Sequence, residues 1–235
     1  MMEPIEWTPD DWFVVPNNIQ TDQPIPKADV LASDRRWGLS DDFSGDELGI
    51  QWCFFRDYEP GRIRVEDNTL HFAAKGNSPS DSAPILVVPS DESYEIQVYY
   101  EVDGTASGGL VLFYDQNMYA GLVTDGEKFT IYRRGQPLEA GKNELGHSGY
   151  LKIRNMENTI TFYYSPDGEA WKKIVRSFVT EAYNHTAFGG FISLRAGLVS
   201  LGEGSMSYRS FIYRRIGPDA KIPADLIVDH EIDVK

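Results

Sequence analysis

The chain has 235 residues, of which 41% are hydrophobic and 13% aromatic, and a formal net charge of −14. This length is within the range of a single all-β sandwich, and the apolar fraction is sufficient for a sizeable core. The negative charge repels phosphate backbones and anionic lipids, which argues against nucleic acid and membranes as partners. It suits a neutral ligand such as a sugar, although many soluble proteins are acidic without having such a ligand.

The N-terminal sequence MMEPIEWTPDDWFVV has neither a basic start nor a long apolar run, so no signal peptide is predicted. No stretch approaches the roughly 20 apolar residues that a membrane span needs. Cys53 is the only cysteine, which excludes an internal disulfide. These features predict a cytoplasmic protein, unless a segment upstream is missing.

Residues 1–38 are rich in proline and aromatic residues. Repeated proline disfavours helices and central strands, whereas large aromatic rings are seldom left in water. The pattern predicts an extended arm that lies along a protein surface and buries Trp7, Trp12 and Phe13. In a longer protein this arm would link two domains.

From residue 39 onward the sequence changes to short apolar segments separated by turn residues. Asp67-Asn68, Asp125-Gly126 and the turn at 156–158 each favour a hairpin. Residues 178–184 are predicted to form at most one helical turn, and the tail 218–235 either adds an edge strand or hangs loose. Strands are predicted over residues 62–66, 69–75, 84–88, 94–102, 109–114, 119–123, 128–133, 150–154, 159–164, 189–195 and 205–215. Their spacing without intervening helices indicates a sandwich or barrel over residues 39–217.

Three stretches carry a resemblance to a known family. They are DDFSGDELGIQW with the later SPSDSAPILVV, then GGLVLFYDQNMYAGL, and finally LKIRNMENTITFYYSPDGEAWKKI. Together they resemble the C-terminal concanavalin A-like module of family 43 glycoside hydrolases, over residues 39–216. EPIEWTPDDWFVVP and PIPK are similar to the segment that joins the catalytic propeller to this module.

The resemblance implies an all-β, concanavalin A-like jelly roll of two antiparallel sheets. It also implies an accessory role beside a catalytic propeller, in β-xylosidases and α-arabinofuranosidases that act on plant hemicellulose. The catalytic carboxylates of that family lie in the propeller, and nothing in this chain matches the propeller, so no catalytic residue is assigned. In such enzymes the module packs on the propeller and can push a loop towards the substrate, and residues 115–118 are the candidate loop.

Aromatic residues in or beside the predicted strands are the candidates for sugar binding. Sugars stack their C–H faces on aromatic rings, and polar side chains fix the hydroxyls. The alternative is that most of these rings belong to the core. The predicted carbohydrate-binding residues are Trp52, Phe55, Arg56, Tyr114, Asp115, Asn117, Tyr119 and Arg195.

Asp41 and Asp42 are candidates for a structural calcium ion, since calcium prefers oxygen ligands. Jelly rolls of the resembled type often pair an acid on the first strand with another on the last, but here Tyr208 and Ser210 stand where that second acid is expected. Binding of no cofactor is the alternative. The four histidines share no metal-ligand spacing, and no nucleophile or phosphate-loop motif is present.

Three hypotheses follow. The first is an accessory domain of a xylan-degrading glycosidase, whose partner is a catalytic propeller or a second copy of the chain. The second is an independent carbohydrate-binding module for xylose- or arabinose-containing oligosaccharides. The third and weakest is a self-contained glycosidase, which needs two carboxylates set across a sugar ring.

Overall fold

The computed structural model describes residues 6–10, 12–14, 38–59, 61–188, 193–217, 219–220 and 228–229. The chain divides into two units, Met1–Trp37 and Gly38–Lys235. In the first unit, β1 (Glu6–Trp7) and β2 (Phe13–Val14) pair as a small antiparallel hairpin. Trp7 and Trp12 are 69% and 67% exposed, and the prediction that the arm buries their rings on a protein surface stays a prediction. Phe13 belongs to β2, and its side chain lies outside the described part of the chain.

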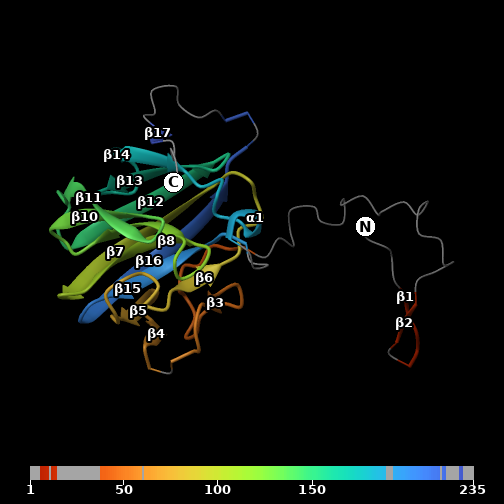
Figure 1. The fold of residues 1–235 in the computed structure, drawn as a ribbon. Helices are drawn as coiled ribbons and strands as arrows, with labels where there is room; N and C mark the ends of the chain where they lie inside the picture. The colour runs from red at the N-terminus through yellow and green to blue at the C-terminus, as the bar shows by residue number, and fades with distance from the viewer. Residues whose placement is uncertain are drawn as a thin grey trace. The chain divides into compact units, whose positions relative to one another are not determined.

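The second unit is built from two sheets (Figure 1). The seven-stranded sheet has the order β11-β10-β9-β8-β15-β6-β3. Its strands, in chain order, are β3 (Cys53–Phe54), β6 (Ile85–Val87), β8 (Ser107–Phe113), β9 (Tyr119–Thr124), β10 (Lys128–Arg133), β11 (Gln136–Lys142) and β15 (Arg195–Leu201).

The eight-stranded sheet has the order β17-β14-β13-β12-β7-β16-β5-β4. Its pairings are antiparallel, apart from the parallel contact between β14 and β17. Its strands are β4 (Ile63–Glu66), β5 (Thr69–Ala73), β7 (Tyr94–Gly104), β12 (Ser148–Met156), β13 (Thr159–Ser165), β14 (Lys172–Val179), β16 (Gly204–Arg215) and β17 (Val228–Asp229). The predicted sandwich of two antiparallel sheets is confirmed.

Alternating side chains place the main core between the sheets. In β7, Ile96 and Val98 are fully buried, and they lie opposite Ile153 and Leu151 of β12. Because successive side chains of a strand point to opposite faces, the intervening polar residues lie on the outer face of the sheet. Phe129 from the seven-stranded sheet joins the same apolar cluster.

Two of the predicted hairpin turns have the backbone geometry that their residues favour. Asp67 and Asn68 have φ angles of 49° and 56°, and Glu157 and Asn158 have 47° and 65°. Positive φ at both central residues is the signature of a tight hairpin turn whose twist matches that of the strands. These turns fix the register of β4 with β5 and of β12 with β13.

Four local predictions differ from the structure. β11 was not predicted because Pro137 and Gly141 interrupt its pattern, which an edge strand tolerates. β14 was also missed, and the predicted helical turn at 178–184 is wrong: Phe178 lies in β14, and the helix α1 spans His185–Phe188. The strand predicted at 189–195 begins only at Arg195 and runs on to Leu201; residues 189–192 lie outside the described residues. Of the tail, Val228–Asp229 forms the edge strand β17.

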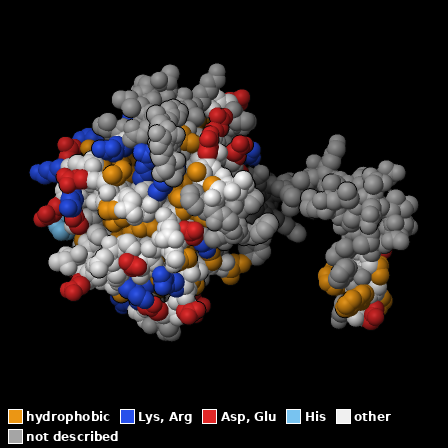
Figure 2. All heavy atoms as spheres, in the orientation of Figure 1, with side chains coloured by type: hydrophobic (Ala, Val, Ile, Leu, Met, Phe, Trp, Pro, Cys, Tyr) orange, Lys and Arg blue, Asp and Glu red, His pale blue; other side chains and the backbone are white. Residues whose placement is uncertain are grey.

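The described surface carries charges of both signs. Figure 2 shows lysine and arginine side chains interspersed with aspartate and glutamate over the face in view. No helix among the described residues is long and apolar enough to cross a membrane.

Candidate functional site

A pocket lies at one side of the sandwich, where both sheets end. β3 is the last strand of the seven-stranded sheet, and β4 is the last strand of the eight-stranded sheet. The pocket between them has a volume of about 610 Å³ and is called the edge pocket below. This volume is within the range of roughly 300–1,000 Å³ that is typical of sites for small molecules.

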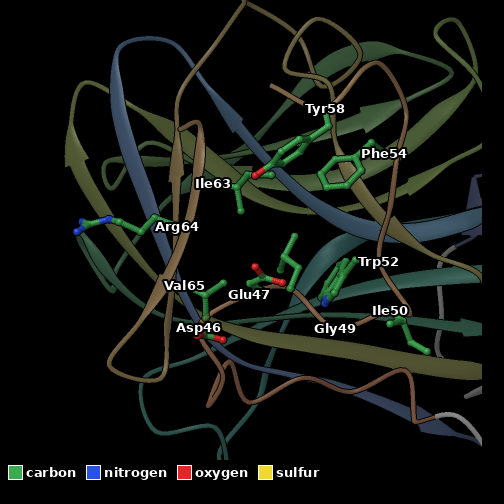
Figure 3. A pocket seen from close by; sticks show the side chains of 11 residues that line it. Asp46, Glu47, Gly49, Ile50, Trp52, Phe54, Tyr58, Ile63, Arg64 and Val65 are labelled. Carbon is green, nitrogen blue, oxygen red and sulfur yellow. The ribbon is translucent and has the colours of Figure 1, made fainter. Parts of the chain in front are cut away.

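Three segments form the walls of the edge pocket. Residues 46–50 precede β3, Trp52, Phe54 and Tyr58 come from β3 and its flanking residues, and residues 63–65 belong to β4. Figure 3 shows the rings of Phe54 and Tyr58 on one side of the pocket, with Asp46, Glu47 and Trp52 on the other. The edge pocket therefore combines aromatic rings with carboxylates.

The aromatic side of the edge pocket is open to solvent. Phe54 is 37% exposed and Tyr58 is 54% exposed, and their ring centroids lie 5.0 Å apart at an interplanar angle of 57°. Ile50, at 77% exposed, adds a third apolar side chain. Val88 is the remaining large hydrophobic side chain that is exposed in the described part of the second unit. Three of these four exposed groups thus line one pocket.

The floor of the edge pocket is rigid. Trp52 is only 7% exposed, and its ring packs on Phe43 and Phe211 at centroid distances of 6.2 and 4.9 Å. Its Nε1–H donates to Asp41 Oδ2 over 2.7 Å. Most of the Trp52 ring is thus committed to the core, and it borders the edge pocket with little open surface; its predicted contact with sugar stays a prediction.

The loop that carries Tyr58 is tied to the sandwich on both sides. Glu59 forms an ion pair with Lys75, and the hydrogen bond from Lys75 holds the pKa of the Glu59 carboxyl below its usual value. Arg62 N donates to Glu59 O over 3.2 Å, and Arg62 Nη2 donates to Ser82 O over 2.7 Å. These contacts anchor the segment that follows Tyr58, and the Tyr58 ring itself contacts Phe54.

Several of the other predicted sugar-binding residues gather on the outer face of the seven-stranded sheet. Phe55 packs on Phe113 at 4.6 Å between centroids, Phe113 stacks on Tyr119 at 5.6 Å, and Tyr119 contacts Tyr132 at 5.7 Å. Arg56 lies over Phe55, and Arg195 lies over Phe113, at 5.5 and 5.9 Å. The structure thus brings Phe55, Arg56, Tyr119 and Arg195 into one cluster.

This cluster is largely closed to solvent. Tyr119 is 2% exposed; burial raises the pKa of its hydroxyl, while hydrogen bonds with Ser78 and Ser80 lower it. The segment around those serines therefore lies against this face of the sheet. The prediction for Tyr119 as a stacking surface is wrong because its ring is covered. Half-buried Phe55 and exposed Arg56 lie at the border of the cluster and stay predictions.

Tyr114 lies on the opposite face of β8 from Phe113, and it is fully buried in the core between the sheets. Its predicted contact with sugar is therefore wrong. Asp115 accepts hydrogen bonds from Asn117 N and Met118 N, each over 2.8 Å, which shapes the short turn between β8 and β9. Asp115, exposed Asn117 and Arg195 stay predictions, as does the role of the loop 115–118.

The donors around Asp41 do not fit the predicted calcium ion. Asp41 Oδ1 accepts Phe43 N over 2.8 Å, and Oδ2 accepts Gln51 Nε2 over 3.1 Å in addition to the indole of Trp52. N–H donors thus take the place that a cation would occupy. Calcium needs six to eight oxygen ligands. Among the residues that the structure describes, no group of three or more His, Cys, Asp or Glu could hold a metal ion.

Asp42 alone does not supply the missing ligands. It is exposed, and its Oδ1 accepts Ser44 N over 3.0 Å; hydrogen bonds from Ser44 lower the pKa of its carboxyl. Asp41, Asp42 and Ser210 line a common hollow, in which Ser210 has a φ of 52° at an irregularity of β16. The residue that shares this hollow with the two aspartates is therefore a serine on a bulge, not a second acid.

The comparisons with known proteins agree with this architecture. A family described as "Beta xylosidase C-terminal Concanavalin A-like domain" matches residues 40–214. The chain belongs to this family. No protein in the comparison with curated sequences matches the chain.

Solved structures with the same fold include glycoside hydrolases of family 43. The GH43 BlXynB protein from Bacillus licheniformis is 19% identical with a TM-score of 0.67, and the match covers 91% of this chain and 46% of that one. Xylan beta-1,4-xylosidase from Bacillus halodurans C-125 is 17% identical with a TM-score of 0.68, covering 90% and 46%. Bacteroides ovatus Xyloglucan PUL GH43B is 16% identical with a TM-score of 0.68, covering 91% and 46%. The family 43 sandwich domain described here thus spans less than half of each of these chains.

Sequence reasoning missed the edge pocket of this family 43 sandwich domain. Tyr58 was not considered for a site, and Phe54, Asp46 and Glu47 stood out as an aromatic strand residue and an acidic turn but were assigned to no site. The available signal was local: Tyr58 stands in the charged stretch RDYEPGR, where an aromatic residue has no strand pattern to bury it. A local pattern does not show that β3 and β4 are the outermost strands of two different sheets, or that these two strands border one pocket.

Proposed function

We propose that this chain serves as a non-catalytic accessory domain of a hemicellulose-degrading glycoside hydrolase of family 43. The observation that carries the proposal is the family match over residues 40–214, together with solved relatives in which a sandwich of this kind occupies less than half of the chain. One of those relatives is named a xylan xylosidase. The proposed partner is therefore a catalytic propeller domain, and the proposed substrate is a xylose- or arabinose-containing oligosaccharide.

The hairpin of the first unit supports a partner surface. Trp7 and Trp12 are both more than half exposed, and Val14 is 44% exposed. A two-stranded hairpin is marginally stable by itself in water, and aromatic side chains such as these are enriched at protein interfaces. In the proposal, Trp7 and Trp12 contact the catalytic domain.

The absence of catalysis is tested with the purified chain on aryl β-xylosides and aryl α-arabinofuranosides. The expected result is no release of the chromophore above the blank at any pH between about 4 and 8, where glycosidase carboxylates operate. Turnover that disappears in Glu47→Gln or Asp46→Asn, but persists in the exposed control Glu139→Gln, would overturn the proposal in favour of a self-contained glycosidase.

The partner is tested by mixing the chain with a family 43 xylosidase catalytic domain prepared without its own sandwich. Sedimentation velocity is expected to show a complex that weakens in Trp7→Ala/Trp12→Ala and persists in the control Val88→Ala. A chain that forms no complex with such domains over the micromolar range would contradict the partner role.

An independent carbohydrate-binding module is the second candidate. The edge pocket favours it, because open aromatic rings beside carboxylates are a common arrangement for binding sugars. This candidate differs from the first in needing no catalytic domain for its function.

A further inference from the structure

We infer that the edge pocket binds the terminal units of a neutral oligosaccharide. This inference adds a ligand site to the proposed function and rests on it only for the expected sugars. It is carried by the shape of the pocket, by the open rings of Phe54 and Tyr58, and by the polar groups that face those rings.

The rings provide the apolar part of the site. A sugar presents C–H groups on its ring faces, and a tilted pair such as Phe54 and Tyr58 offers one such face and one edge. Both rings keep a large exposed fraction despite their neighbours, so the sandwich does not need them for its own core. Phe54 is held in place by the pairing of β3 with β6, opposite Ile85.

The polar groups of the edge pocket are suited to hydroxyl ligands. Glu47 lies across the pocket from the two rings, and Asp46 lies at its margin beside Val65 (Figure 3); both acidic residues are exposed. Ionised carboxylates only accept hydrogen bonds, and the Tyr58 hydroxyl can donate as well as accept. Sugar hydroxyls donate and accept, so they can satisfy both kinds of group.

The charges of the pocket disfavour an anionic ligand. Arg64 is the one cation among the lining residues that the structure describes, and Figure 3 shows its guanidinium pointing away from the pocket. Arg64 Nη1 lies 2.6 Å from Glu66 Oε1, so its charge is already paired on β4. Asp46 and Glu47 repel carboxylates and phosphates, as does the net charge of −14. A neutral polyol fits both the rings, through its C–H groups, and the acids, through its hydroxyls.

The form of the pocket indicates that it binds an end of the sugar chain. The floor is closed by Trp52, which is fixed by its hydrogen bond to Asp41, while the mouth between the two edge strands opens to solvent. A terminal residue can therefore enter, and further residues extend outwards past Ile50 and Tyr58. Preorganised rings and an anchored loop reduce the ordering cost of binding.

The test is a calorimetric and NMR titration of the whole chain with xylotriose, α-1,5-linked arabinotriose and trigalacturonate. The two neutral sugars are expected to bind saturably in the millimolar range or tighter, and trigalacturonate at least about tenfold more weakly. Tyr58→Ala and Phe54→Ala are each expected to weaken binding about tenfold or more, and Glu47→Gln to weaken it measurably. Val88→Ala and Glu139→Gln, exposed positions outside the pocket, are the matched controls.

Three outcomes would overturn the inference. The first is the absence of saturable binding of either neutral sugar at millimolar concentrations by a folded chain. The second is binding that Tyr58→Ala and Phe54→Ala leave unchanged. The third is self-association of the chain that these two variants abolish while sugars have no effect, since the apolar mouth would then be a protein interface. The accessory role is tested by turnover and by complex formation, whereas the edge pocket is tested by sugar titration. A negative titration therefore does not contradict the accessory role, and a negative result for that role does not contradict sugar binding in the edge pocket.

Discussion

At the scale of single residues, Asn143 shows how one buried polar group joins the two sheets. It is 3% exposed and follows β11. Its Nδ2 lies 2.9 Å from the hydroxyl of Tyr100 in β7 and 2.8 Å from Thr124 Oγ1 in β9. Its Oδ1 accepts Leu145 N over 2.8 Å. One amide thus links a strand of each sheet to the loop that leads into β12.

Asn143→Ala is expected to lower the free energy of unfolding by about 2–3 kcal/mol, because it leaves several buried partners without a hydrogen bond. The measurement is the urea midpoint followed by tryptophan fluorescence. The control is Asn117→Ala, at an exposed turn position, which should change stability by less than about 0.5 kcal/mol. Equal effects of the two substitutions would contradict this role of Asn143.

Residue-scale prediction of the site had limited success for a physical reason. Trp52, Tyr114 and Tyr119 have the composition of a sugar-binding surface, but each ring is buried. An aromatic ring in a strand serves equally well for a core or for an open face, and only the covering of that face decides between them. Phe54 and Tyr58 stay open because they lie in and just after β3, the last strand of its sheet, which has no further strand on its outer side.

At the scale of elements, β7 carries two glutamates whose ion pairs differ greatly in burial. Glu95 pairs with Arg214 of β16 and Arg154 of β12, each at 3.0 Å, and its side chain is 6% exposed. Lys152, 8% exposed, lies 3.6 Å from the same carboxylate; burial lowers the pKa of its amine, and Glu95 opposes that change. Glu101 pairs with Arg209 of β16 at 3.0 Å, but both side chains are well exposed.

Glu95→Gln is expected to destabilise the chain by about 3–5 kcal/mol, since it leaves three cations around an uncharged group, one of them buried. Glu101→Gln is its matched control, because it changes the same residue type on the same strand opposite the same neighbouring strand. Its expected cost is below about 1 kcal/mol. Chemical denaturation gives the free energy of unfolding of both variants. Equal losses in the two variants would show that the Glu95 cluster contributes no more than a surface ion pair.

The prediction of strands and turns was most accurate where the residues of a short segment determine its backbone conformation. The positive φ angles at Asp67-Asn68 were anticipated because these residue types tolerate them. β14 and β11 were missed because each obtains its conformation from pairing with a neighbour, β13 and β10 respectively. Strand propensity depends on such tertiary contacts more than helix propensity does.

At the scale of the whole molecule, buried tyrosines make the sandwich sensitive to alkali. Burial raises the pKa of Tyr100 to about 12 and that of Tyr132 to about 12. In the unfolded chain both ionise near pH 10. Their contribution to stability is therefore complete below pH 10 and is lost as the pH rises from about 10 to about 12, when the unfolded state is ionised and the folded state is not.

The free energy of unfolding is expected to stay level from pH 8 to about 10 and then to fall; Tyr100 and Tyr132 each contribute on the order of 2 kcal/mol, and buried Tyr94 and Tyr208, whose pKa is also raised, add to the fall. Ultraviolet absorbance of tyrosinate should show these groups titrating only above pH 11 or on unfolding. Tyr132→Phe removes one of them and should flatten the fall. A decline that begins below pH 9 would contradict this origin.

The second prediction for the whole molecule concerns calcium. Because N–H donors occupy both oxygens of Asp41, excess EDTA and millimolar calcium are expected to give the same thermal midpoint. A ligand that binds only the folded state raises the midpoint with its concentration. A thermal midpoint that rises with calcium in the unmodified chain, but not in Asp42→Asn, would therefore support a calcium site at these aspartates.

The sequence alone determined the all-β class, the hairpins and the family, because alternation of side chains and turn residues are local properties that survive without the fold. The tertiary structure decided which aromatic rings are covered and which are open. It also decided the existence of the edge pocket, since β3 and β4 are consecutive along the chain but join different sheets, each through its own pairing with other strands. Such a site depends on the order of strands in space, and that order is a sum of long-range contacts that no segment specifies by itself.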